Sequence, residues 1–221
     1  MNVETALLNR KSTRSFLDKD VPIETINSIL NQAKTAPSGV NTQPWQVAVV
    51  TGKSKRSIQK KMEDTFRSGN KGSMDYEYYP TQWDGRYKER RKACGLLLYS
   101  TLDIKREDKQ RQLDQWAANY RAFDAPVMLL FFIDSVLEKG SYIDYGMFLQ
   151  SIMLAAVAEG LATCPQAALG EYPDIVRDEL GYSDDVALVC GMALGYEDES
   201  NIINSYRTSR ESLDEIVKYF P

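Results

Sequence analysis

The spacing of apolar positions predicts three helices and a strand in the first third of the chain. Residues 2–9 predict a short helix whose last turn runs into Arg10 and Lys11, positive charges that suit the C-terminus of a helix. A second helix is expected over 22–37, from a proline to a Pro-Ser-Gly turn. Residues 45–51 are dense in β-branched side chains and predict a strand. A third helix is expected over 54–67, with Ser54 as its N-cap.

Two later segments have the uninterrupted apolar character of strands that are covered on both faces. They are 126–134 (PVMLLFFID) and 187–196 (ALVCGMALGY). Residues 142–158 are almost wholly apolar, which predicts a helix at the centre of the core or at an interface. Residues 163–170 are interpreted as a loop after this helix. Further helices are expected at 86–102, 105–120 and 173–180.

The periodic pattern dissolves at 68–87, a long irregular stretch that is rich in tyrosine and tryptophan. A connection of this length is often a lid or a binding loop, although its rings can also do no more than pack it against the body. No internal repeat or change in composition marks a linker. We therefore expect one domain over 1–221, with a lid at 68–100 and a C-terminal arm at 200–221.

The charge balance and the missing histidine exclude several classes of protein. Lys and Arg number 27 and Asp and Glu number 31, and this net charge of −4 argues against a protein that binds nucleic acid. The 221 residues contain no histidine, which removes Ser-His-Asp and Cys-His pairs and His-ligated zinc. Cys94, Cys164 and Cys190 are widely spaced, so we expect no metal site and reduced core thiols in a cytoplasmic protein.

No segment is expected to enter a membrane. The most apolar stretch, 146–161, is interrupted by polar residues and is shorter than the ~20 residues that a membrane-spanning helix needs. The N-terminal segment lacks the unbroken apolar run of a secretory signal. We therefore expect it to belong to the folded protein.

The first candidate site is the basic cluster at 10–14 (RKSTR), which combines three cations and two hydroxyls. Guanidinium forks form short, strong bonds to phosphate. A basic helix end that only faces solvent would explain the same residues. A second basic pair, Arg207 and Arg210, stands near the C-terminus and is open to the same two interpretations.

Two turn-rich loops are further candidates. The loop 36–45 (APSGVNTQPW) carries Gly39, which lets backbone amides converge on a ligand, and Asn41 and Gln43, whose amides suit the edge of a heterocycle. It can also be a plain connection from helix to strand. The loop 163–170 can present backbone amides to a ligand or simply reverse the chain. No GxGxxG, Walker, EF-hand or zinc pattern is present.

The joint order of these motifs carries more information than any one of them. RKSTRSF, APSGVNTQPW, GLATCPQAALGEYP and NSYRTSRESLDEIV follow one another along the chain, and together they resemble the nitroreductase family of FMN-dependent flavoproteins. The resemblance implies an α+β fold with a mostly antiparallel central sheet surrounded by helices. It also implies an intertwined homodimer, in which the C-terminal segment crosses onto the partner and the loop 36–45 holds the isoalloxazine of the opposite subunit.

The resemblance implies roles for single positions. Arg10 and Ser12 are expected at the FMN phosphate or ribityl chain, with Arg210 as a remote phosphate clamp. Arg14 is expected at the pyrimidine edge of the ring, where a fixed cation favours reduction. The backbone N–H of Ala167 is expected to face N5, although many relatives carry glutamate at this position. The full set of expected cofactor contacts is Arg10, Lys11, Ser12, Thr13, Arg14, Pro37, Ser38, Gly39, Asn41, Gln43, Pro165, Gln166, Ala167, Arg207 and Arg210.

The implied activity needs no histidine. A nicotinamide donor, NADH or NADPH, passes hydride to FMN and leaves, and a small aromatic acceptor such as a nitroaromatic takes its place, which is a ping-pong mechanism. Protons can come from water, so no catalytic side chain is expected. The expected substrate contacts are Tyr76, Tyr79, Trp83 and Phe123.

Two other functions compete with this one. Reductive dehalogenation of a halotyrosine occurs on the same fold, but that branch normally has His and Glu where this chain has Asn41 and Gln43. Flavin fragmentation or dehydrogenation of a small ring is more distant. From another class, a binding module without flavin could recognise an acidic ligand through Arg10, Arg14 and Arg210.

Overall fold

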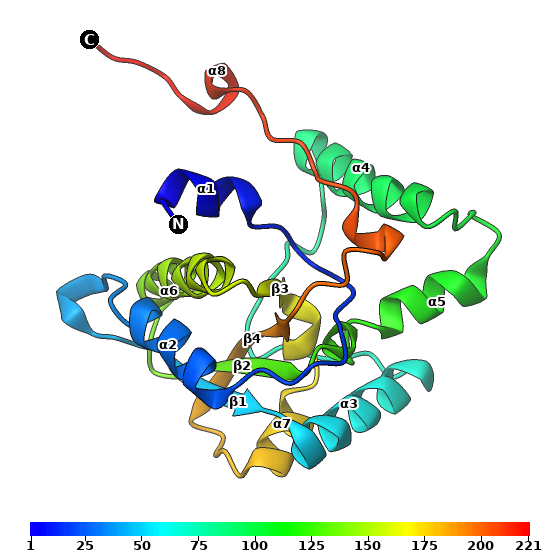
Figure 1. Cartoon of the computed structure of the whole chain (residues 1–221), viewed down its shortest axis with the longest axis horizontal. Helices are drawn as coiled ribbons and strands as arrows, with labels where there is room; N and C mark the ends of the chain where they lie inside the picture. Colours follow the sequence, from blue (N-terminus) through cyan, green and yellow to red (C-terminus); the bar gives the residue numbers. More distant parts are fainter.

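A four-stranded antiparallel sheet runs through the middle of the molecule, with the strand order β1-β2-β4-β3 (Figure 1). The computed structural model describes all residues from Met1 to Pro221. Helices cover both faces of the sheet, which confirms the α+β fold that the resemblance implies. The strands are β1 (Gln46–Val50), β2 (Val127–Asp134), β3 (Ala162–Gln166) and β4 (Val186–Gly195).

The two central strands are apolar throughout because each face of the sheet meets a hydrophobic cluster. Every residue of β4 is buried, and so is every residue of β2 except Asp134. Alternate side chains of β2 enter different clusters: Leu129 joins Ile29 and Phe148 on one face, whereas Leu130 joins Ile58 on the other. Burial on both faces explains the uninterrupted apolar runs in the sequence.

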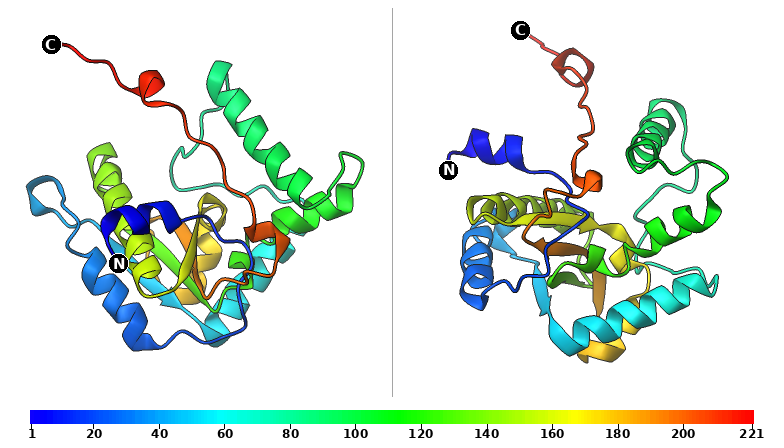
Figure 2. Two further views of the ribbon diagram at one scale, coloured as in Figure 1. Left: turned by 45° about the horizontal axis from the view of Figure 1, so that its top comes forward. Right: turned by 45° about the vertical axis from the view of Figure 1, so that its right-hand side comes forward.

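The chain forms eight helices, of which some cover the sheet and others stand away from it (Figures 1 and 2). The helix α2 packs with α6 against one face, and α3 packs with α7 against the other. By contrast, α4 has no buried residue and stands away from the sheet beside the C-terminal arm. The bounds are α1 (Val3–Asn9), α2 (Ile23–Ala33), α3 (Gly52–Arg67), α4 (Gly85–Thr101), α5 (Lys109–Ala117), α6 (Lys139–Ala158), α7 (Pro173–Leu180) and α8 (Leu213–Ile216).

Three sequence-based expectations about elements are wrong. Residues 162–166 form the edge strand β3 rather than a loop, and Pro165 fits there because an edge strand tolerates a residue that cannot donate. The helix α3 begins at Gly52 after Thr51, so Ser54 lies inside it and is not its N-cap. The helix α5 begins only at Lys109, because the residues before it form a turn. None of the helices has the length and apolar character needed to span a membrane.

Candidate functional site

The N-terminal basic cluster crosses the outer edge of β3. The Thr13 N–H donates to the Thr163 carbonyl oxygen at 3.0 Å, and Ser12 forms a parallel bridge to Thr163. This crossing brings both flanking arginines close to the buried Cys164. Burial raises the pKa of the Cys164 thiol to about 11, while Arg14, Ser12 and Arg10 oppose the rise. Cys164 is therefore a core thiol and not a thiolate nucleophile.

Asn204 ties the C-terminal segment to this crossing. Its side-chain oxygen accepts from the Arg14 N–H at 2.8 Å, and its amide nitrogen donates to the carbonyls of Ser15 and Asp198 at 2.9 Å each. The Lys11 ammonium donates to the Asn204 carbonyl at 2.8 Å and pairs with Glu197 at 2.6 Å. Lys11 is thus occupied within the chain, and its cofactor contact stays a prediction.

Three arginines from the two ends of the chain come together beside this crossing. Burial, followed by the neighbouring charges of Arg210 and Arg207, lowers the pKa of Arg10. None of the three guanidiniums forms an ion pair with a carboxylate of the chain. Like charges that gather without a counter-ion raise the free energy of the folded chain, and a bound anion removes that cost. We call Arg10, Arg207 and Arg210 the arginine trio.

The members of the arginine trio are not equally available to a ligand. The Arg207 guanidinium donates to the carbonyls of Leu8 at 2.6 Å and Asn9 at 2.8 Å, which are exposed carbonyls at the end of α1. Arg210 bonds only within its own turn, to Thr208 and Ser209. Arg207 therefore caps a helix in this structure, whereas Arg210 lines a cavity.

Pro165, Gln166 and Ala167 line a cavity of about 340 Å³ at the end of β3. Tyr76 and Tyr78 form part of its wall, together with residues of α6 and β4. The turn that begins at Ala167 can lie directly on β4 because β4 carries Gly191 there: an added Cβ would overlap the Leu169 side chain.

Several polar atoms along β3 are buried without a partner. They are the hydroxyl oxygens of Thr13 and Thr163 and the amide oxygen Oε1 of Gln166. The other end of the Gln166 amide donates to the Asn119 carbonyl at 2.9 Å. Buried polar groups in folded proteins are almost always paired, so these atoms indicate a polar ligand. Together with the arginine trio, they fit a molecule with a phosphate at one end and a polar ring at the other.

The loop 36–45 lies away from the other motifs, beside the N-terminal half of α6 (Figures 1 and 2). The Gly39 N–H donates to Asp144 Oδ2 at 3.0 Å, and Val40, Asn41 and Gln43 have left-handed backbone angles. No hydrogen bond joins the loop to 10–14, to β3 or to the arginine trio. The expected contacts Pro37 to Gln43 therefore do not meet the rest of the site within one chain.

The first half of the irregular stretch is fastened to the body. The Asp75 carboxylate bonds the Arg177 guanidinium and the Leu188 N–H at 2.8 Å each, and the Tyr76 hydroxyl donates to the Val189 carbonyl at 2.8 Å. Gly72 lies so close to the Glu171 backbone that a side chain would overlap it. We call residues 70–76 the strap.

Beyond the strap, the aromatic side chains pack on one another. Tyr78 contacts Tyr79 with ring centroids 4.6 Å apart, Tyr79 contacts Trp83 at 5.6 Å, and Arg91 lies 5.5 Å from the Trp83 ring. We call Tyr78, Tyr79 and Trp83 the aromatic ladder. Of the expected substrate contacts, Tyr76 lines the cavity at β3, and Tyr79 and Trp83 belong to the aromatic ladder.

The fourth expected substrate contact, Phe123, lies in the hydrophobic core and not at this cavity. Its side chain is only 5 % exposed and packs in the same cluster as Ile58 and Val176. Its ring thus packs in the core at a tight turn, and its substrate contact stays a prediction. Conversely, sequence reasoning does not single out Asn204 or Tyr142, although asparagine in a polar turn is a known capping signal. No cluster of His, Cys, Asp and Glu is placed to hold a metal ion.

Comparison with known proteins identifies the family. The sequence model described as "Nitroreductase family" matches residues 7–196. The chain belongs to the nitroreductase family. This nitroreductase-family chain is 35% identical to the 4-nitrobenzoate reductase of Pseudomonas putida over 94% of this chain and 91% of that protein. It is 36% identical to the chloronitrobenzene nitroreductase of Comamonas testosteroni over 98% of this chain and 96% of that protein.

Solved structures agree with this assignment. The structure of the FMN and NADPH-dependent nitroreductase NfnB from Sphigopyxis sp. strain HMH superposes with a TM-score of 0.97 and 37% identity, covering 100% of both chains. An iodotyrosine dehalogenase homologue of Caenorhabditis elegans is 26% identical over 96% of this nitroreductase-family chain and 59% of its own length. The relatives that reduce nitroaromatics are thus more similar to this chain than that dehalogenase is.

The strap generates a test of its own. Asp75→Ala is expected to lower the free energy of unfolding by about 1–3 kcal/mol, because the largely buried Arg177 guanidinium and the Leu188 N–H lose their common partner. Urea unfolding measures this loss, and limited proteolysis should cut residues 70–84 faster. Asp184→Ala is the matched control, since this fully exposed carboxylate also lies 3.5 Å from Arg177. Equal losses in both variants would contradict the strap.

Proposed function

We propose that this nitroreductase-family protein is an FMN-dependent oxidoreductase that passes hydride from NADH or NADPH to a small aromatic acceptor such as a nitroaromatic, by a ping-pong mechanism. The arginine trio carries this proposal, because three clustered guanidiniums without a carboxylate suit the phosphate of FMN. The nitroaromatic reductases among the relatives support the acceptor class. The FMN and NADPH dependence of the similar NfnB structure supports the cofactor and the donor.

Distinct groups of residues would hold the two ends of FMN. Arg10 and Arg210 would bind the phosphate, and the hydroxyls of Ser12 and Thr13 would form hydrogen bonds with the ribityl chain. Residues 165–167 would lie along the ring. Bound FMN supplies a ring that accepts and releases hydride, which is why a chain without histidine can catalyse the reaction.

Arg14 is held rigidly enough to act as a fixed charge at the ring edge. Its backbone N–H is bonded to Asn204, its Nη1 donates to the Ser12 carbonyl at 3.1 Å, and its guanidinium lies 5.7 Å from the Tyr206 ring. A preorganised cation stabilises negative charge without having to move when the charge appears. Arg14 would therefore favour the reduced form of the ring.

We infer a homodimer from the incomplete site and from exposed apolar side chains. The loop 36–45 is separated from the arginine trio within one chain, so a second copy would supply it. Ile143 on α6 is 70% exposed, and Leu8 on α1 and Phe220 in the C-terminal arm are also exposed. Apolar side chains spread over these elements suit a permanent interface, which resembles a hydrophobic core cut in two.

The cysteines support a reducing compartment, and we place the protein in the cytoplasm on this ground. All three thiols are free; Cys164 and Cys190 are buried, whereas Cys94 is exposed and is not the core residue that the sequence predicts. An exposed free thiol in an oxidising compartment invites disulfide formation between molecules. Cell fractionation tests this location.

Two alternatives are less well supported. For dehalogenation of a halotyrosine, the chain lacks the His and Glu that this branch normally has in the loop, because Asn41 and Gln43 stand at those positions. A binding module without flavin would leave the purified protein colourless even after FMN is added. Assays with both nicotinamides against nitroaromatics and halotyrosines separate the remaining possibilities.

Arg210→Ala is expected to weaken FMN binding by about 1.5–3 kcal/mol, roughly 10- to 150-fold, which is the strength of a hydrogen bond to a charged group. Fluorescence titration of the apoprotein with FMN measures the change. Arg106→Ala is the control, because Arg106 is an exposed arginine whose side chain has no partner. Unchanged affinity in Arg210→Ala would remove the clamp role.

Sedimentation equilibrium is expected to give the mass of a dimer, which is twice the 25.1 kDa of one chain. The reason is that the loop 36–45 can complete the site only from another copy. A monomeric species that retains FMN at dilution would contradict the shared site.

Tyr78→Ala is expected to change the relative kcat/KM of large and small nitroaromatics by about tenfold, since an aromatic contact is worth roughly 1 kcal/mol and the cavity also widens. The FMN content should not change. Trp116→Ala, which removes an exposed ring of α5 outside the aromatic ladder, serves as the control. If both variants keep the wild-type acceptor profile, the aromatic ladder has no part in acceptor choice.

A further inference from the structure

The first two turns of α4 are positively charged, whereas the chain as a whole is negatively charged. Five cations and one acid stand within residues 86–92, whereas the whole chain has a net charge of −4. The first turn of α4 contains no acidic residue, and the helix buries none of its residues. Cations are unfavourable near the positive end of a helix dipole, so this arrangement costs stability. The positive charges are Arg86, Lys88, Arg90, Arg91 and Lys92.

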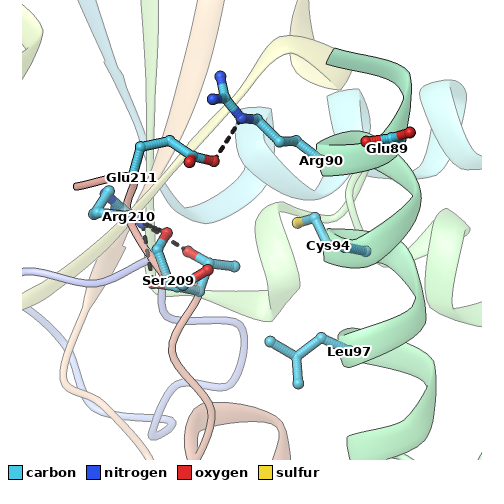
Figure 3. Close-up of a pocket in the computed structure, with 9 residues that line it drawn as sticks. Glu89, Arg90, Cys94, Leu97, Ser209, Arg210 and Glu211 are labelled. Carbon is cyan, nitrogen blue, oxygen red and sulfur yellow. Dashed lines mark hydrogen bonds and ion pairs between the residues drawn. The ribbon is translucent and has the colours of Figure 1, made fainter. Parts of the chain in front are cut away.

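Two of these cations face the C-terminal arm. Figure 3 shows Arg90 on the side of α4 that also presents Cys94 and Leu97 toward the arm. Arg86 precedes Arg90 by four residues and therefore lies on the same face, one turn earlier. Arg86 donates to the Tyr87 hydroxyl at 3.3 Å, and this hydroxyl and, more weakly, Glu215 and Glu211 raise the pKa of Arg86.

A cavity of about 610 Å³ separates this face of α4 from the arm. Arg90 lines one wall and Arg210 the other, so the cavity connects the helix to the arginine trio. Its volume lies in the range of sites for small ligands. An anionic molecule in this cavity would meet Arg90 and Arg210 from two sides, and the carboxylates of Glu89 and Glu211 line the cavity as well.

A carboxylate of the arm now occupies the Arg90 fork. Glu211 lies 2.7 Å from Arg90 Nε, and both side chains are about 40% exposed, at 42% and 39%. Exposed ion pairs of this kind contribute little net stability. A phosphate, which carries more charge and more acceptor oxygens, would displace the carboxylate at small cost.

We propose that Arg86 and Arg90 bind a phosphate group of the nicotinamide donor, and that Glu211 competes with this phosphate for Arg90. The inference rests on the proposed function. FMN has a single phosphate, for which Arg10, a partly buried residue, and Arg210 are the proposed partners, and a resident cofactor suits a partly buried contact. Arg86 is exposed and Arg90 is half-buried, on a helix without buried residues, which suits a ligand that enters and leaves in every cycle.

The same ion pair has a second explanation, in which Arg90 and Glu211 only hold α4 against the C-terminal arm. If Arg90 and Glu211 only hold the helix to the arm, Arg90→Ala and Glu211→Gln break one contact and act alike. If Arg90 binds phosphate, the two changes act in opposite directions, because one removes the binding group and the other removes its competitor. The sign of the two effects distinguishes the explanations.

The experiment uses the FMN-loaded protein and four variants: Arg86→Ala, Arg90→Ala, Glu211→Gln and Lys92→Ala. Lys92 is the matched control, since it is a cation of the same helix on the opposite face. The KM of NADPH and of NADH is measured, together with the Kd of adenosine 2′,5′-bisphosphate and of NADP⁺ by fluorescence. We expect Arg90→Ala and Arg86→Ala each to raise the KM of the donor about tenfold, Glu211→Gln to lower it, and Lys92→Ala to leave it unchanged.

The comparison of NADPH with NADH shows which phosphate of the donor is bound. A rise for NADPH alone, with weaker binding of the bisphosphate, assigns the 2′-phosphate, whereas equal rises for both donors assign the pyrophosphate. Equal signs for Arg90→Ala and Glu211→Gln, an unchanged KM in both arginine variants, or loss of FMN from Arg90→Ala would overturn the proposal. Failure of the proposed function itself is distinct, because the wild-type protein would then take up no FMN.

Discussion

Hydrogen bonds around Asn204 and Thr163 hold the two ends of the chain together over β3, and the rest of the site depends on them. Arg10 and Arg210 repel each other, so they remain neighbours only because the backbone beside them is fixed. The side chains of Asn204 and Lys11 form the hydrogen bonds that fix this backbone. The hydroxyls of Thr13 and Thr163 are buried without a partner at this crossing, as expected where an external molecule completes the network.

The fold was largely predictable from the sequence, because burial on both faces leaves a clear apolar signal. The strands β2 and β4 and the helix α7 were predicted within one residue at each end. The strand β3 was not, because Pro165 and its short length hide an edge strand, whose pairing to β4 depends on distant residues. The same limit applies to helix starts, where Thr51 and Gly52 begin α3 without a side-chain cap.

The candidate site was predictable as a set of motifs but not as a geometry. The order of the four motifs indicated which residues matter, and three of these motifs meet around β3. The sequence could not tell that Arg207 would cap α1 or that Phe123 would fill the core, since both roles depend on what the folded chain places next to them. It also could not show that residues 70–76 are fastened to the body, because the partners of Asp75 and Tyr76 lie more than a hundred residues away along the chain.

The distance between the loop 36–45 and the arginine trio has a genetic consequence. In the proposed homodimer, each site draws its phosphate contacts from one polypeptide and its loop from the other. A chain damaged at Gly39 and a chain damaged at Arg210 would therefore form mixed dimers in which one of the two sites is assembled wholly from intact parts. Two inactive alleles expressed in the same cell would restore part of the activity that neither has alone.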